Sequence, residues 1–333
     1  MPTFRALPGF FCQSEKTANP DFFDWKDPRA RFGLIRSWSR LKEEVAELQH
    51  KHGNRNVKVL FLARHGQGVH NLVMAKYGRE WWEKEGMNAQ YSNEEYTWGP
   101  DPELTELGVK QAQEARDAWK SQLELFDPVP LPQAFYVSPF SRACDTAAIT
   151  WGFDTKAEKR GDGEKLWLVP DSRANSESRD VGESRDQVGS GSTFGSESTG
   201  VDSSSVKSSK SSSTPTVLIH PLLRETIGFN TCDKRRPIEY TLDRYPDFSL
   251  TPNYPAPPSG EDDLWTVEHR ETNEEMQLRL KGFLENLFEH EKETYVSITC
   301  HAGVIRNMLA VLGHRKWFLQ TGGMVPVVVV RET

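Results

Sequence analysis

Short apolar runs recur along this chain, and each of them stops abruptly at charged or polar residues. The clearest run is VKVLFLA at residues 57–63, and comparable runs occupy residues 134–137, 217–220, 295–300 and 324–330. Their β-branched and aromatic residues are typical of buried strands in a mainly parallel sheet. Segments with apolar residues at spacings of three and four lie between them, which is typical of helices. The pattern predicts an α/β fold, a three-layer α/β/α sandwich around a mainly parallel sheet.

Capping residues mark the ends of several of these helices. Residues 34–49 carry one apolar face, and Thr105 is a suitable N-cap for a helix that runs to about residue 125. Thr272 and Glu275 have the spacing of a capping box at the start of another helix. The last apolar run contains Pro326, which favours an edge position because proline cannot donate a hydrogen bond to a neighbouring strand.

Three stretches depart from this alternation. Residues 171–216 are rich in serine and glycine and almost free of large apolar side chains, which predicts a disordered insertion. Residues 228–266 are rich in proline and aspartate and are interpreted as a cap region over a substrate site. Residues 1–56 carry many aromatic side chains and are predicted to be a strap and a helix packed on the domain. Residues 57–333 would then form one domain around the insertion.

The composition indicates which kinds of molecule the protein binds and in which cellular compartment it is found. The 333 residues include 36% hydrophobic residues and carry a formal net charge of −7, which argues against nucleic-acid binding but allows a local basic site for a small anion. The four cysteines lie far apart without a CxxC pair, so neither a disulfide framework nor a zinc site is indicated. No run reaches transmembrane length, and the first residues lack a secretory pattern. We expect a soluble, cytoplasmic protein without membrane or nucleic-acid partners, with access to the nucleus left open.

Chemically reactive residues follow four of the apolar runs, close to the point where each strand would end. They are Arg64 with His65, Arg142, Glu225 and His301. Because the carboxyl ends of parallel strands meet at one edge of a sheet, these side chains are expected to converge there. This convergence is the main inference from the pattern alone.

Such a set of residue types suits phosphoryl transfer. Arg64 and Arg142 could each donate two hydrogen bonds to non-bridging phosphate oxygens. A neutral His65 could attack phosphorus and form a phosphohistidine, while a cationic His301 would stabilise the transferred group. Glu225 would act first as general acid and then as base, a role that needs a pKa raised by burial. The arginines supply positive charge, so no metal and no cofactor are required, and the partner would be a small phosphorylated substrate.

Several motifs in this order resemble the histidine phosphatase superfamily, in its phosphoglycerate-mutase-like branch. They are RHGQGVHN at 64–71, LTELG at 104–108, VSPFSRACDTA at 137–147, LLRE at 222–225 and CHAG at 300–303. Together they span roughly residues 57–313. The segments GVHN, CDKRR at 232–236 and EDDLW…RET at 261–272 are most similar to fungal phosphoglycerate-mutase-like proteins.

The resemblance implies a phosphoglycerate-mutase-like fold and a role for each matching residue. It implies His65 as phospho-acceptor, Glu225 as proton donor, and Arg64, Arg142 and His301 around the phosphate, with Gln67 and Asn71 lining the same site by position. Asp233, Arg235 and Arg236 in CDKRR are candidates for the substrate pocket, although a solvated charge run explains them equally well. His70 is expected to pack against or orient its neighbours.

The expected function is a metal-independent phosphomonoesterase that acts on a sugar phosphate or a nucleotide. Alternative functions are left open. One is a phosphoglycerate-type mutase, which is disfavoured because the residues around Glu225 lack the surroundings expected in a glycolytic mutase. A second is a non-catalytic regulatory or binding protein with the same fold. Residues 66–71 also resemble the start of a dinucleotide fingerprint, but its third glycine is missing.

Overall fold

The computed structural model describes residues 2–87, 92–156, 215–252 and 260–332. Residues 171–214 of the predicted insertion lie outside these ranges. The strands are β1 (Thr3–Leu7), β2 (Val57–Arg64), β3 (Ala134–Val137), β4 (Val217–Ile219), β5 (Phe248–Leu250), β6 (Tyr295–Cys300) and β7 (Met324–Glu332). The helices are α1 (Trp38–His52), α2 (Val69–Tyr77), α3 (Arg79–Trp81), α4 (Glu106–Leu123), α5 (Ser141–Trp151), α6 (Ile238–Arg244), α7 (Asn273–His290) and α8 (Ala302–Val311).

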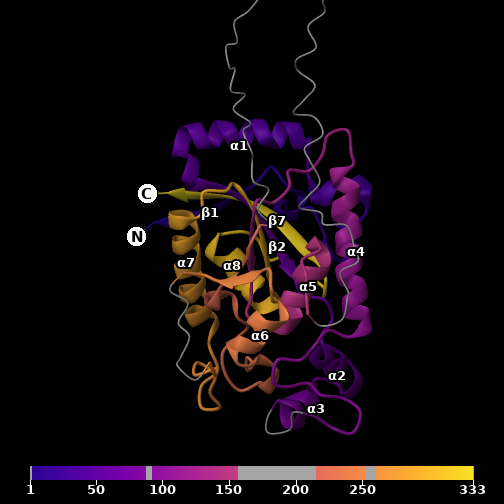
Figure 1. The fold of residues 1–333 in the computed structure, drawn as a ribbon. Helices are drawn as coiled ribbons and strands as arrows, with labels where there is room; N and C mark the ends of the chain where they lie inside the picture. Colours follow the sequence, from indigo (N-terminus) through magenta and orange to yellow (C-terminus); the bar gives the residue numbers. More distant parts are fainter. Residues whose placement is uncertain (1, 88–91, 157–214, 253–259, 333) are drawn as a thin grey trace, which may run out of the picture. The chain divides into compact units, whose positions relative to one another are not determined.

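The strands of the described residues form one seven-stranded sheet in the order β1-β7-β2-β6-β3-β4-β5 (Figure 1). From β2 to β5 each strand is parallel to its neighbour, whereas β7 is antiparallel to both β1 and β2. The predicted mainly parallel sheet is therefore confirmed. The carboxyl ends of β2, β6 and β3 lie side by side in its centre.

Alternate residues of the strands face two layers of helices, which confirms the three-layer sandwich. On β2, Val57, Val59 and Phe61 pack in one cluster with side chains of α1, α4 and α5. Leu60 and Leu62 of the same strand pack in a second cluster, with side chains of α7 and α8. Figure 1 shows α7 and α8 on one side of the sheet and α4 and α5 on the other. The period of two along β2 thus places one apolar face against each layer.

The helix boundaries follow from local capping. The Ser37 hydroxyl accepts a hydrogen bond from the backbone N–H of Arg40 at the start of α1. At the start of α7, Thr272 and Glu275 each accept a hydrogen bond from the other's backbone N–H, which confirms the predicted capping box. The Thr105 hydroxyl accepts from the N–H of Gly108 at the start of α4, as predicted.

The structure differs from the sequence-based prediction at both ends of the sheet. Residues 1–56 hold more than a strap and a helix, because Thr3–Leu7 forms the edge strand β1 beside β7. The prediction that Pro326 marks an edge strand is therefore wrong. Proline is tolerated there because β1 pairs only with residues 328–332 of β7, so Pro326 has a strand neighbour on one side alone. At the other end, the region expected as an irregular cap contains α6 and contributes β5 to the sheet.

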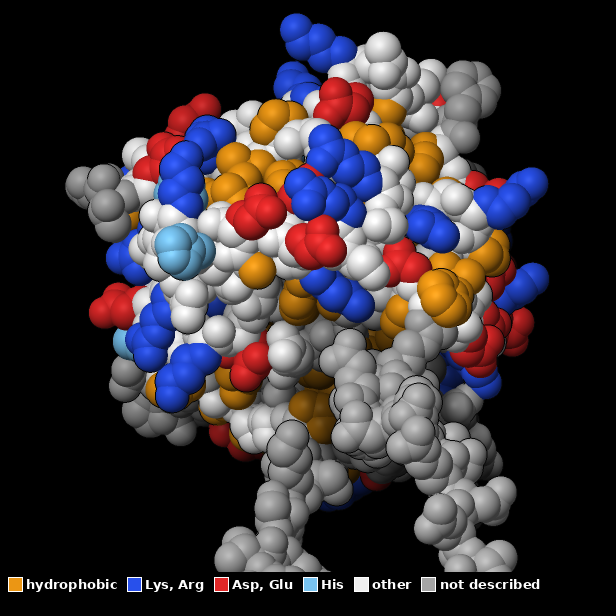
Figure 2. Space-filling model, turned by 90° about the horizontal axis from the view of Figure 1, so that it is seen from above, with side chains coloured by type: hydrophobic (Ala, Val, Ile, Leu, Met, Phe, Trp, Pro, Cys, Tyr) orange, Lys and Arg blue, Asp and Glu red, His pale blue; other side chains and the backbone are white. Residues whose placement is uncertain are grey.

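The surface carries both signs of charge close together. Figure 2, seen from the α1 end, shows basic and acidic side chains interspersed over this face, with hydrophobic side chains in small groups between them. On α1 itself, Arg40 forms ion pairs with Glu43 and Glu44. No helix in the described part of the chain combines the length and the apolar composition needed to cross a membrane.

Candidate functional site

The residues predicted to converge lie at adjacent strand ends. His65 follows β2, and its backbone N–H donates to the carbonyl of Cys300 at the end of β6. Ser138 follows β3, and its N–H donates to the carbonyl of Thr299 in β6. These two bonds tie the three central strand ends together, so the loops that leave them are held at one place.

Two glycines let the loop after β2 approach α4 closely. A Cβ at Gly66 would lie 2.3 Å from the carbonyl oxygen of Gly108, and a Cβ at Gly108 would lie 2.1 Å from the carbonyl oxygen of Gln67. Neither position has room for a side chain. The glycines of RHGQG and LTELG therefore fix the backbone that carries His65.

His65 is buried, with 2% of its surface exposed. Its Nδ1 lies 2.6 Å from the carbonyl oxygen of Gly66. Because a carbonyl oxygen only accepts hydrogen bonds, Nδ1 carries the proton and Nε2 keeps a free lone pair. Burial, followed by the charges of Arg142 and Arg64, holds the pKa of His65 well below its ordinary value. The imidazole is thus neutral and has one nucleophilic nitrogen.

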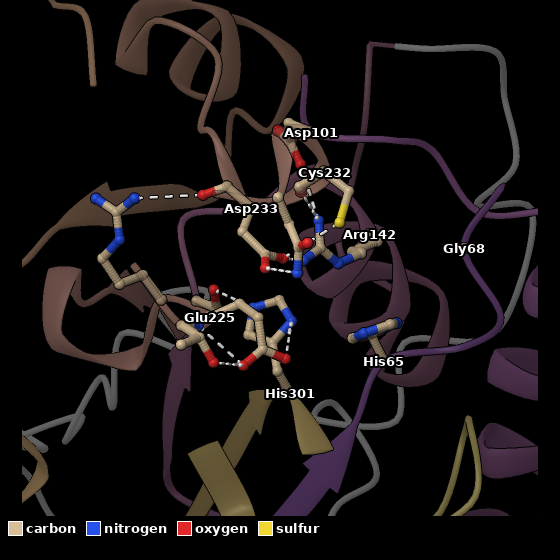
Figure 3. A network of polar contacts seen from close by, with 12 residues as sticks. His65, Gly68, Asp101, Arg142, Glu225, Cys232, Asp233 and His301 are labelled. Atoms are coloured by element: carbon tan, nitrogen blue, oxygen red, sulfur yellow. Dashed lines mark hydrogen bonds and ion pairs between the residues drawn. The ribbon is translucent and has the colours of Figure 1, made fainter. Parts of the chain in front are cut away.

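Two guanidinium groups stand beside this histidine. Arg64 donates from Nη1 to the carbonyl oxygen of Leu319 at 2.8 Å. Arg142 is fully buried in the first turn of α5, where it donates to the carbonyl oxygen of Cys232 and to the Asp233 carboxylate (Figure 3). The Nε atoms of both arginines are buried without a hydrogen-bond partner among the described residues.

His301 is also fully buried, and its ring centroid lies 5.1 Å from that of His65. Its Nε2 lies 2.7 Å from the Ser138 hydroxyl oxygen, while its Nδ1 has no hydrogen-bond partner in the described part of the chain. Burial and then the charge of Arg142 hold the pKa of His301 well below its ordinary value. In this state the ring is neutral, and the cationic form expected with bound phosphate stays a prediction.

Glu225 reaches the same place from the loop that follows β4. Its Oε1 accepts hydrogen bonds from the N–H and the hydroxyl of Thr226, and its Oε2 lies 3.9 Å from Nδ1 of His301 (Figure 3). A Cβ at Gly303 would lie 2.6 Å from Oε1, so this glycine makes room for the carboxyl group. Burial, followed by the negative charge of Asp233, raises the pKa of Glu225.

The side-chain amide oxygens of Gln67 and Asn71 accept hydrogen bonds from other groups of the protein. The Asn71 side-chain oxygen accepts from the N–H of Gly68, and the Gln67 side-chain oxygen accepts from the Thr105 hydroxyl. Both contacts stabilise the loop between β2 and α2. That these side chains line a phosphate site remains a prediction.

The three candidates in CDKRR have different surroundings. Asp233 is brought into the site, between the guanidinium groups of Arg142 and Arg270. Arg235 is buried and donates to the backbone carbonyls of Arg236, Gly260 and Glu261, so these donors hold the cap region together. Arg236 pairs with Glu103 and lies over the ring of Tyr240.

Two further residues of the site were missed by the sequence analysis. Ser138 directly follows β3, the same position that His65 and His301 hold after their strands, and this position could have identified it. Asp101 accepts hydrogen bonds from the backbone N–H and hydroxyl of Ser141 and lies 3.8 Å from Arg142. It comes from an irregular loop with a positive φ of 45°, for which the sequence pattern gives no signal.

Comparison with known proteins gives consistent results. A sequence profile described as "Histidine phosphatase superfamily (branch 1)" matches residues 60–160. A "Probable phosphoglycerate mutase" of Arthroderma benhamiae is 32% identical, over 99% of this chain and 85% of that protein. A "Probable phosphoglycerate mutase PMU1" of Saccharomyces cerevisiae is 28% identical, over 98% of this chain and 96% of that protein. The likeness to these fungal proteins thus extends well beyond the motifs.

A comparison with solved structures finds a match to a mycobacterial glucosyl-3-phosphoglycerate phosphatase. It is 18% identical, with a TM-score of 0.39, and the match covers 83% of this chain and 98% of that one.

Proposed function

The chain belongs to the histidine phosphatase superfamily, and we propose that it hydrolyses phosphomonoesters through a phosphohistidine formed on His65. The reaction would need no metal ion, and its substrate would be a small soluble phosphorylated metabolite such as a sugar phosphate or a nucleotide. The observation that carries this proposal is a group of buried donors without partners in the described residues: Nε of Arg64, Nε of Arg142 and Nδ1 of His301. Because buried donors are normally paired, these atoms are suited to the oxygens of a bound phosphoryl group.

In the first step, the lone pair on Nε2 of His65 attacks phosphorus as the bond to the leaving alcohol breaks. The hydrogen bond from Nδ1 to Gly66 orients the ring for this attack. Glu225 donates its proton to the leaving oxygen, and its raised pKa supports this role because the carboxyl group must be protonated beforehand. The products of this step are the free alcohol, phosphohistidine and the Glu225 carboxylate.

In the second step, a water molecule attacks the phosphohistidine. The Glu225 carboxylate accepts a proton from this water, the P–N bond breaks, and its electron pair returns to Nε2 of His65. Inorganic phosphate leaves, and both residues regain their initial state. Throughout, Arg64, Arg142 and His301 would stabilise the charge on the equatorial oxygens by hydrogen bonding.

A phosphoglycerate-type mutase is the second candidate, and the names of both fungal relatives favour it. A mutase returns the phosphoryl group from histidine to a second substrate oxygen and must exclude water. Hydrolysis is preferred here because the residues around Glu225 lack the surroundings expected in a glycolytic mutase.

Phosphate release tests this proposal. The purified full chain is assayed with EDTA present against a panel of sugar phosphates, nucleotides and p-nitrophenyl phosphate, beside a His65→Ala variant. A His220→Gln variant is the matched control, because His220 is buried elsewhere, next to the ring of Phe283. We expect release by the wild type and the control, and none by His65→Ala at an unchanged melting temperature.

The other outcomes separate the alternatives. Interconversion of phosphoglycerates without phosphate release would replace the phosphatase by a mutase. Equal phosphate release by His65→Ala would remove His65 from the mechanism. Release that EDTA abolishes would contradict the metal-independent reaction. An inert wild type, in both the release and the interconversion assay, would favour a binding protein with this fold.

A further inference from the structure

One imidazole near His65 takes no part in the two steps above. His70 lies in the first turn of α2, five residues after His65 in the sequence. Only 7% of its surface is exposed, and its ring centroid lies 5.7 Å from that of His65. The helix therefore turns a third histidine toward the candidate nucleophile.

The Nδ1 atom of His70 is buried and has no hydrogen-bond partner in the described residues. A residue that served only to fill space here would be replaced at little cost by an apolar ring, because burying an unpaired polar atom is unfavourable. Because this unpaired nitrogen lies beside the candidate nucleophile, it is available to a ligand bound there. The same condition holds for Arg64 Nε, Arg142 Nε and His301 Nδ1. The ring centroid of His301 lies 5.1 Å from that of His65, and burial, followed by the charges of both arginines, lowers the pKa of His65.

The electrostatic environment agrees with this grouping. Burial lowers the pKa of His70 well below its ordinary value, and the charges of Arg142, His65 and Arg64 lower it further. In turn, His70 is among the groups that lower the pKa of His301. His70 thus lies within the electrostatic field of every basic group that the proposed reaction uses.

The loop before α2 leaves space for this ring. A Cβ at Gly68 would lie 2.7 Å from Cε1 and Nδ1 of His70 and 3.5 Å from Cδ of Arg142. The missing side chain at Gly68 therefore lets the imidazole lie against the loop, close to the stem of Arg142. The N–H of Gly68 is bound to the Asn71 side chain, so it is not the partner of Nδ1.

We propose that His70 is a third imidazole of the phosphate site, which donates a hydrogen bond from Nδ1 to a non-bridging oxygen of the bound phosphoryl group. This inference rests on the proposed function, because it requires that the site binds a phosphoryl group. It gives His70 a role in binding substrate and the transition state, and leaves the nucleophilic role to His65.

The test measures anion binding separately from turnover. Isothermal titration with inorganic phosphate and with orthovanadate is carried out on the wild type, His70→Phe and His70→Gln. We expect His70→Phe to weaken phosphate binding by about tenfold or more, the usual effect of losing one hydrogen bond to a charged group. His70→Gln, whose side-chain amide can still donate, should recover part of the affinity. KM for a phosphomonoester should rise in the same order.

A second buried histidine supplies the matched control. Nδ1 of His220 accepts a hydrogen bond from the N–H of Leu222, so this ring is satisfied within the protein. His220→Phe should therefore lower the melting temperature of the ligand-free protein and leave phosphate affinity unchanged. His70→Phe should lower phosphate affinity without lowering the melting temperature, because it removes the unpaired Nδ1 and no internal hydrogen bond of that atom.

The outcomes distinguish this inference from the function on which it rests. Wild type that binds phosphate, with His70→Phe and His70→Gln binding it equally well, would show that His70 only packs. Wild type that binds neither phosphate nor vanadate would overturn the proposed function and this inference with it. A loss of affinity in His220→Phe equal to that in His70→Phe would show a general structural effect and would also overturn the assignment.

Discussion

Ser138→Ala tests how the second histidine of the site is oriented. The Ser138 hydroxyl oxygen lies 2.7 Å from Nε2 of His301, and both residues are fully buried. A hydroxyl can donate to an imidazole nitrogen or accept from it, and we expect the Ser138 hydroxyl to donate its proton to Nε2. The proton of the neutral His301 ring must then be on Nδ1, the atom that is available to a phosphate oxygen. Without the hydroxyl, the ring can adopt the other tautomer, which presents a lone pair to that oxygen.

The size of the effect follows from the burial of this pair. Leaving one buried nitrogen unpaired costs about 1–3 kcal/mol. If this free energy is lost from the transition state, kcat/KM falls by between about fivefold and about a hundredfold. The backbone bond from Ser138 to Thr299 does not involve the hydroxyl, so the end of β3 should keep its place.

The assay is steady-state phosphate release, with melting temperatures measured in parallel. Thr150→Ala is a suitable control, because it removes another buried hydroxyl, whose partner is the carbonyl of Ala112. We expect both variants to lose some stability and only Ser138→Ala to lose much activity. If Ser138→Ala kept kcat/KM within about twofold of the wild type while losing stability, the orientation argument would be refuted.

Three other predictions concern the titrating groups of the site. Glu225→Gln should slow the release of the alcohol in the first turnover by about a hundredfold or more for alkyl phosphates, and much less for p-nitrophenyl phosphate, since p-nitrophenolate leaves without a proton; equal losses of this first-turnover rate on both esters would argue against a general acid. Asp233→Asn removes a charge that raises the pKa of Glu225, so the alkaline limb of the pH–rate profile should move to lower pH; a limb that stays in place would contradict this coupling. Folding lowers the pKa values of His65, His70 and His301. The unfolded chain therefore binds more protons than the folded protein below about pH 6.5. The free energy of unfolding should fall as the pH drops, by up to about 1.4 kcal/mol per pH unit for each histidine. Chemical denaturation between pH 7 and pH 5 measures that loss, and a flat profile would contradict the lowered pKa values.

The centre of the fold could be predicted from the sequence because its signals are local. The apolar run of β2 is buried almost throughout, and the alternation of Val59, Leu60, Phe61 and Leu62 between two helix layers follows from the geometry of a strand. The capping boundaries of α4 and α7 were predictable for the same reason, since one side chain and one backbone group three residues later decide them. The edge strand β1 was not predictable in this way, because its burial depends on pairing with residues 328–332 at the other end of the chain.

The site shows the same division between local and distant signals. His65, Arg142, Glu225 and His301 could be predicted to lie together because each follows a recognisable strand, and parallel strands place their carboxyl ends at one edge of a sheet. The surroundings of Arg142 depend on Asp101 and Asp233, which come from loops far apart in the sequence. Arg235 could equally have faced a substrate, and only the folded cap region shows that its donors bind backbone carbonyls.

The proposed reaction passes through a phosphoryl group bound covalently to His65, and trapping this intermediate is the decisive experiment. The full chain is mixed with a hydrolysable phosphomonoester in EDTA, quenched in alkali within the first turnover, digested and analysed by mass spectrometry. We expect an acid-labile phosphoryl group on the peptide that contains His65, absent from His65→Ala and accumulating in Glu225→Gln with p-nitrophenyl phosphate. Phosphate release from the wild type without any labelled His65 peptide, or with the label on another residue, would contradict it.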